Sequence, residues 1–121
     1  MAKRTGPTNP RLKELIEMLR MQYKKTRKPI WRDLAERLEK PTRQRIEVNL
    51  KRIERYAKEG ETIVVPGVVL GDGNLTKKLT IFAWRFSSQA RKKIEKANGK
   101  ALSLKDLIKL NPEGKNLRLM G

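Results

Sequence analysis

The sequence contains neither cysteine nor histidine, so the side chains behind much of enzyme chemistry are missing. Without cysteine there is no disulfide framework and no thiolate metal site, and without histidine the commonest general base and metal ligand is absent. The thirteen Asp and Glu residues are mostly single and interleaved with Lys or Arg, unlike the clustered carboxylates of a metal-dependent nuclease. These absences argue against an enzyme, a cofactor, a bound metal and a small-molecule substrate.

Long apolar runs are absent too. Runs such as Ile63–Val65 and Val68–Leu70 are far too short to span a membrane. No amphipathic helix has an aromatic face that would hold the chain on a membrane surface, so no membrane partner is expected. The N-terminus lacks the apolar stretch of a secretory signal, and we therefore expect a cytoplasmic protein.

Positive charge is what the sequence has in excess. Thirty Lys and Arg oppose the thirteen acids, which gives a net charge of +17 over 121 residues. A surface that only serves solubility mixes the two signs and keeps its excess smaller in a domain of this size. A polyanionic partner is the better explanation, because each cation that meets a phosphate releases condensed counterions and many weak contacts add up.

The first half of the chain has the patterns of two helices and a short strand. Asn9 and Pro10 predict the start of a helix, and Pro29 predicts the start of a second helix that ends before Pro41. The apolar residues expected to face the core at helical spacing are Leu12, Leu15, Ile16, Leu19, Ile30, Trp31, Leu34, Ala35 and Leu38. Residues 46–50 alternate like a strand, and residues 51–58 fit a short helix carrying Ile53, Tyr56 and Ala57; one helix over residues 42–58 is the alternative.

The character of the sequence changes at Gly60, from charged and helical to β-branched and punctuated by glycine. We therefore expect a basic arm with helices over residues 1–60, embedded in RNA, and a globular α/β domain over residues 61–121. In that domain, residues 62–65, 68–70 and 79–86 read as strands, the last apolar on both faces and so covered on both. Two capped helices, after Ser87 and Ser103, and a last short strand made of Leu117, Leu119 and the C-terminus complete the pattern. In the helix after Ser87, the lysines Lys92, Lys93 and Lys96 are expected to point outward.

The candidate RNA-binding residues are Lys and Arg side chains, with Arg favoured for bidentate phosphate contacts and Lys acting as a point charge. The segment from Lys24 to Arg45 contains nine basic and only three acidic residues and is the densest positive stretch in the chain. The candidates are Lys3, Arg4, Arg11, Lys24, Lys25, Arg27, Lys28, Arg32, Lys40, Arg43, Arg45, Lys51, Arg52, Arg55, Lys77 and Lys78. Trp31 could stack on a base, but its helical spacing with Leu34 and Leu38 favours a place in the core.

Two other motifs have ordinary structural explanations. Gly71-Asp72-Gly73 lacks the third glycine of a dinucleotide fingerprint and the Lys-Ser/Thr of a P-loop, so a tight turn is favoured. A serine–lysine catalytic pair from Ser87 or Ser88 with Lys92 is rejected, because a serine before a helix is ordinarily a cap and the rest of the motif is missing.

Two long segments resemble the signature shared by large-subunit ribosomal proteins fifteen and eighteen-e: Val69–Thr80 (VLGDGNLTKKLT) and Phe86–Lys100 (FSSQARKKIEKANGK). The first half is similar to the eighteen-e family in its archaeal length, through TGPTNP (5–10), PIWRDLAERLEKP (29–41), EVNL (47–50) and GETIVVPG (60–67). This resemblance implies an irregular superhelix of strand, strand and helix in the C-terminal domain. It departs from the family at Asn98, where a glycine pair is common, and Asn tolerates the same left-handed helix end.

The resemblance implies a structural protein of the large ribosomal subunit whose partners are the large-subunit rRNA and neighbouring ribosomal proteins. Contacts to phosphate and to shape are expected, because duplex RNA hides its base edges in a deep narrow groove. The alternative is a DNA-binding or chromatin protein, since two helices near Pro41 look like a helix-turn-helix. The strand-like residues 46–50 argue against it, because a recognition helix should stand there.

Overall fold

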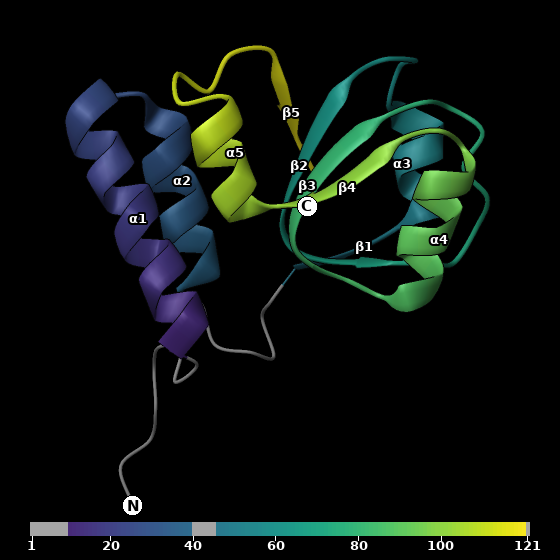
Figure 1. Ribbon diagram of the computed structural model, residues 1–121, viewed down its shortest axis with the longest axis horizontal. Helices are drawn as coiled ribbons and strands as arrows, with labels where there is room; N and C mark the ends of the chain where they lie inside the picture. Colours follow the sequence, from purple (N-terminus) through teal and green to yellow (C-terminus); the bar gives the residue numbers. More distant parts are fainter. Residues whose placement is uncertain (1–9, 40–45, 121) are drawn as a thin grey trace, which may run out of the picture.

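Five parallel strands lie at the centre of the computed structural model, which describes residues 10–39 and 46–120 (Figure 1). The helices are α1 (Pro10–Thr26), α2 (Pro29–Leu38), α3 (Leu50–Tyr56), α4 (Ser88–Lys96) and α5 (Leu104–Leu110). The strands are β1 (Ile46–Asn49), β2 (Thr62–Leu70), β3 (Thr80–Phe86), β4 (Lys100–Ser103) and β5 (Leu117–Leu119). The mixed α/β class expected from the sequence is confirmed.

Strand β2 organises the sheet. It pairs with β3 along one edge, and along the other edge it pairs first with β5, through Thr62 to Val64, and then with β1, through Gly67 to Leu70. The register against β3 shifts between Val65 and Val68, so Pro66 and Gly67 form an irregularity where the neighbouring strand changes. The expectation of two separate strands at residues 62–65 and 68–70 is therefore wrong: they are one strand with a bulge.

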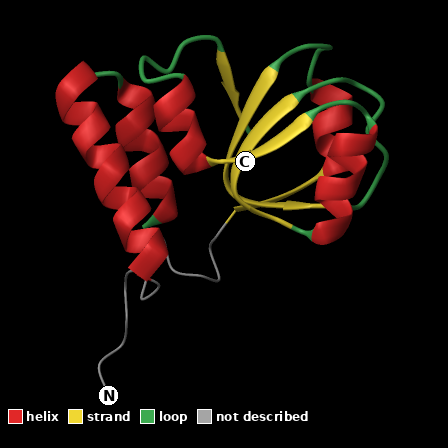
Figure 2. Ribbon diagram, in the orientation of Figure 1, coloured by secondary structure: helices red, strands yellow, loops and turns green. Residues whose placement is uncertain are grey.

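Helices cover both faces of this sheet (Figure 2). Helices α1, α2 and α5 pack with Val64 and Phe82 on one face, while α3 and α4 pack with Ile63, Val65 and Ile81 on the other. A parallel sheet buried on both sides needs apolar residues on both, which explains the nearly unbroken apolar run of β2. The prediction that β3 is covered on both faces is confirmed. Strand alternation places Phe86 on the face of Phe82, but Phe86 packs against the core on the other face, the one that includes Ile81.

The predicted core sides of α1 and α2 and the caps of α4 and α5 are confirmed, while the expected cap Asn9 lies outside the described residues. Leu12, Leu15, Ile16 and Leu19 of α1 are buried, and Trp31 of α2 is 0% exposed, so it is a core residue and not a base-stacking one. Ser87 accepts a hydrogen bond from the N–H of Ala90, and Ser103 and Asp106 form a capping box. Asn98 has φ 65°, the left-handed helix end expected there.

The short elements in the middle of the chain are β1 and α3. Residues 46–56 form this strand and helix, and not the single helix that is the alternative over 42–58; residues 42–45 lie outside the described residues. Both elements precede Gly60 yet share the core of the C-terminal sheet. The division into residues 1–60 and 61–121 stays a prediction. Strand β4 is an addition to the predicted elements, because Ala101 and Leu102 alone are too short a signal.

The connection from β2 to β3 runs back along α3. The backbone N–H of Lys51 donates to the carbonyl of Asp72, Glu54 accepts from both the N–H and the hydroxyl of Thr76, and Glu59 accepts from the N–H of Lys78. The turn expected at Gly71-Asp72-Gly73 thus begins the connection between the parallel strands β2 and β3, with Gly73 at φ 100°. We call this connection, residues 71–79, the return loop. This loop and α3 together form one side of the molecule.

Candidate nucleic-acid interface

Five of the candidate cations gather where α1 ends and α2 begins. Lys24 and Lys25 occupy the last turn of α1, a position the helix dipole favours for cations. Arg27 and Lys28 form the connection, and Pro29 starts α2 immediately afterwards, which places Arg32 in its first turn. All five side chains are exposed. We call the surface of Lys24, Lys25, Arg27, Lys28 and Arg32 the hairpin tip.

An aromatic ring holds part of the hairpin tip in place. The guanidinium carbons of Arg27 and Arg32 lie 5.7 and 5.6 Å from the centroid of the Tyr23 ring. Cations at this distance from a ring are attracted to its negatively charged face. The two guanidinium groups are therefore positioned before any partner arrives, which reduces the entropy lost when they bind.

A second group of cations lies on α3. Leu50 and Ile53 bury one side of this helix, and the other side presents Lys51, Arg52 and Arg55, which are all exposed. Their spacing of three and four residues places them on one helix face. We call the surface of Lys51, Arg52 and Arg55 the α3 face. Together with Tyr56 these residues line a hollow of about 470 Å³.

Most of these cations are not neutralised within the described residues. Among residues 10–39 and 46–120, no carboxylate lies within 4.0 Å of Lys24, Lys25, Lys28, Arg52 or Arg55. The two cations that do have acidic neighbours make long, exposed ion pairs: Lys51 with Asp72 at 3.5 Å and Arg32 with Glu36 at 3.8 Å. Exposed pairs contribute little, so a phosphate can replace these carboxylates at small cost.

Of the other candidates that the structure describes, Lys77, Lys78 and Arg11, none is a member of these two surfaces. The ammonium of Lys77 donates to the backbone carbonyls of Glu54 and Ala57 at 2.6 Å each, so it caps the end of α3. Lys78 is exposed on the return loop, and Arg11 is exposed in the first turn of α1, away from the hairpin tip. The candidates Lys3, Arg4, Lys40, Arg43 and Arg45 lie outside the described residues.

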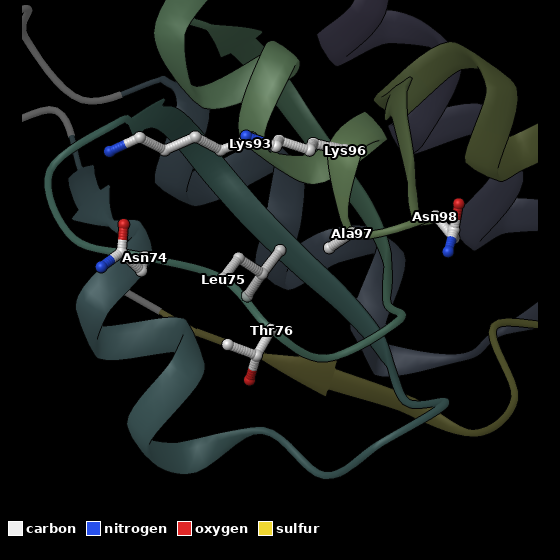
Figure 3. A pocket seen from close by; sticks show the side chains of 7 residues that line it. All are labelled: Asn74, Leu75, Thr76, Lys93, Lys96, Ala97 and Asn98. Atoms are coloured by element: carbon white, nitrogen blue, oxygen red, sulfur yellow. The ribbon is translucent and has the colours of Figure 1, made fainter.

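Another hollow, of about 590 Å³, lies between the return loop and α4 (Figure 3). Asn74 and Thr76 line it from the loop, and Lys93, Lys96 and Asn98 line it from α4 and its end. The ammonium of Lys93 donates to the carbonyls of Gly71 and Gly73, at 2.8 and 2.6 Å. The expectation that this lysine points outward is wrong: it fastens the loop to the helix. Lys96 is exposed and is not one of the candidates.

Within residues 10–39 and 46–120, three carboxylates have lowered pKa values, and each bonds to another element of the fold. The backbone N–H of Thr76 lowers the pKa of Glu54, and the backbone N–H of Lys58, followed by Arg118, lowers that of Glu61. The ammonium of Lys105 lowers the pKa of Glu14, linking α5 to α1. A catalytic acid or base needs a pKa close to the working pH, and these shifts move away from it.

The hairpin tip and the α3 face lie on opposite sides of the sheet. Helices α1 and α2 belong to the core that includes Val64 and Phe82, while α3 belongs to the core on the other sheet face (Figure 1).

No helix within residues 10–39 and 46–120 is long and apolar enough to cross a membrane. The same residues contain no group of three acidic side chains that could hold a metal ion. The described chain is thus a covered sheet with cations on two sides.

Comparison with known proteins gives consistent matches over the full length. A family described as "Ribosomal protein 60S L18 and 50S L18e" matches residues 1–121. The chain is similar to the "Large ribosomal subunit protein eL18" of Methanopyrus kandleri, at 47% identity over 96% of this chain and 95% of the relative. The protein of the same name from Haloarcula marismortui is 51% identical over 93% of this chain and 97% of the relative, and that from Methanothermobacter thermautotrophicus is 43% identical over 99% of each.

Proposed function

The chain belongs to the family of ribosomal proteins 60S L18 and 50S L18e and is a structural constituent of the large ribosomal subunit, and we propose that it joins two segments of the large-subunit rRNA. The named relatives come from archaea, in agreement with the archaeal length of the sequence. As members of the family are structural proteins of the cytoplasmic ribosome, the chain takes part in translation and is not an enzyme.

The observation that carries the proposal is the position of unneutralised cations on both sides of one covered sheet. A protein with a single basic side binds along one RNA surface, whereas cations on two sides suit insertion between two. The hairpin tip would hold one phosphate backbone and the α3 face another. Both surfaces consist of point charges and guanidinium forks, which recognise phosphate geometry and not base sequence.

The basic segment 1–60 is proposed to be the part most embedded in RNA, and the sheet with α4 and α5 the part that docks outside. The hairpin tip lies at one end of the α1–α2 pair, in the helical layer on the opposite side of the sheet from α3 and α4 (Figure 1). Neighbouring ribosomal proteins are the other expected partners. The DNA-binding alternative has no support, since the family is ribosomal and strand β1 stands where a recognition helix would be needed.

The test is a salt titration of binding to large-subunit rRNA transcribed in vitro. Each lost phosphate contact should reduce the slope of log affinity against log salt by about one. The double variant K24Q/K25Q should therefore reduce the slope by about two, and R52Q/R55Q should do the same. Lys13→Gln, an exposed cation of α1 outside both surfaces, is the matched control and should leave the slope nearly unchanged.

The proposal that the chain joins two rRNA segments can be tested with rRNA fragments. If the two surfaces hold separate RNA segments, an rRNA fragment containing only one of them should respond to one double variant and not to the other. Co-sedimentation with large subunits in sucrose gradients should weaken for both. Equal slopes for the wild type, both double variants and Lys13→Gln would contradict the phosphate contacts, and binding that follows duplex DNA as well as rRNA would restore the DNA alternative.

A further inference from the structure

Tyr56 is a large aromatic residue that is exposed to solvent, unlike the other apolar residues of α3. It is 53% exposed, although Leu50, Ile53 and Ala57 of the same segment are buried. The spacing of these three residues defines the buried side of α3, and Tyr56 falls outside it. An aromatic residue this exposed forgoes much of the burial that stabilises such a side chain elsewhere, so it is available to a partner.

The surroundings of this ring are cationic. Tyr56 lies four residues after Arg52 and one after Arg55, and these three residues with Lys51 line the hollow of about 470 Å³ beside α3. No carboxylate of the described residues lies within 4.0 Å of Arg52 or Arg55. An apolar protein partner would have to desolvate these charges without compensation. A ligand with both a flat ring and a negative charge fits the site much better.

We propose that Tyr56 stacks on an unpaired base of the rRNA while Arg52, Arg55 and Lys51 hold the phosphates on either side of it. Stacking on aromatic rings is the general way in which proteins take hold of bases that are not paired, and it tolerates any base because each has a flat face. This inference rests on the proposed function and deepens it: the α3 face binds a bulged, looped or terminal nucleotide, whereas the hairpin tip binds phosphates alone.

The helix fixes the geometry that such a site needs. Leu50 and Ile53 anchor one side of α3 in the core. The ammonium of Lys77 donates to backbone carbonyls at the end of α3 at 2.6 Å each, so the final turn, which carries Tyr56, is fixed in position. The return loop adds the bonds between Glu54 and Thr76. A ring on a rigid turn loses little freedom on binding, which favours stacking. At the hairpin tip the aromatic ring of Tyr23 is already engaged by Arg27 and Arg32.

The experiment compares Tyr56→Ala, Tyr56→Phe and R52Q/R55Q in the salt titration of rRNA binding. Tyr56→Ala should weaken binding by between about five-fold and 150-fold, the effect of removing an aromatic ring from one stacked base. Its salt slope should stay that of the wild type, since no charge is removed, whereas R52Q/R55Q should lower the slope by about two. Tyr56→Phe keeps the ring and should bind like the wild type.

Chemical probing of the rRNA supplies the second measurement. One unpaired nucleotide should be protected by the wild type and by Tyr56→Phe, and exposed again with Tyr56→Ala. Unchanged affinity and unchanged protection with Tyr56→Ala, in a protein that otherwise binds rRNA, overturn the stacking proposal and leave the proposed function intact. The stacking proposal is also overturned if Tyr56→Ala leaves binding to the isolated rRNA unchanged but impairs assembly when other ribosomal proteins are present, because Tyr56 would then contact a protein. Absence of rRNA binding by the wild type would instead refute the proposed function.

Discussion

The attachment of the return loop to α4 by Lys93 gives a prediction whose size can be worked out from the structure. Its ammonium donates to the carbonyls of Gly71 and Gly73 at 2.8 and 2.6 Å, in a partly buried position. A hydrogen bond to a charged group contributes roughly 1.5–3 kcal/mol when its loss leaves a partner unsatisfied. Since water can reach these carbonyls in part, Lys93→Met should reduce the free energy of unfolding by about 2 kcal/mol for both bonds together.

The neighbouring lysine supplies the control. Lys92 is exposed, and Lys92→Met removes the same charge from a molecule whose net charge is +17. Any gain from lower self-repulsion is therefore common to both variants, and Lys92→Met should stay within about 0.5 kcal/mol of the wild type.

Thermal and urea unfolding of the free protein measure the difference. For a chain of this length, 1 kcal/mol corresponds to about 4 °C, so the midpoint of Lys93→Met should fall by about 8 °C and that of Lys92→Met by less than about 2 °C. Equal midpoints for the two variants would refute the reasoning, because they would mean that the loop does not depend on the ammonium.

Three further changes test other parts of the fold. Gly67→Ala should destabilise the protein by about 1–3 kcal/mol, measured by urea unfolding, because its Cβ would lie 2.1 Å from the carbonyl oxygen of Ile46 in β1. Ser103→Ala should cost about 1 kcal/mol in the same assay through loss of the α5 cap. The hydrogen bonds of Thr76 lower the folded-state pKa of Glu54 below 4.5, so their stabilisation is complete above that pH and is lost as pH falls through the folded value. The difference in melting midpoint between wild type and Glu54→Ala should therefore be largest near neutral pH and shrink in acid; a constant difference would contradict the linkage.

The parts of the fold that follow from local patterns could be predicted from the sequence. Helical spacing alone places Trp31 in the core, and the serine and asparagine at the ends of α4 are recognised by their capping chemistry. Local patterns divide strand β2 in two, because Pro66 lacks an N–H and Gly67 weakens a strand. The reason that the strand continues is not local: its neighbour changes from β5 to β1 at that point.

The site is harder to predict than the fold, because the sequence gives the position of a lysine but not the direction of its ammonium. Lys77 and Lys93 look like surface charges in the sequence, yet both turn back to backbone carbonyls more than ten residues away. Because Tyr56 follows Ile53 by three residues, the sequence pattern places both on one helix side. The buried side of α3 is instead the one shared by Leu50, Ile53 and Ala57. A helical wheel centred on Leu50 would have placed Tyr56 outside the core.

The coverage of the sheet explains why the two proposed binding surfaces lie on helices and on the connection between α1 and α2. With α1, α2 and α5 on one face and α3 and α4 on the other, the central strand β2 is buried along most of its length, unlike the sheets on which other proteins stack bases directly (Figure 2). The cations of the two proposed surfaces accordingly stand on the outer sides of α1, α2 and α3, on opposite faces of the sheet. A sheet covered on both faces thus offers two outward helical sides for the proposed binding, and Lys77 and Lys93 hold the return loop to α3 and α4 on one of them.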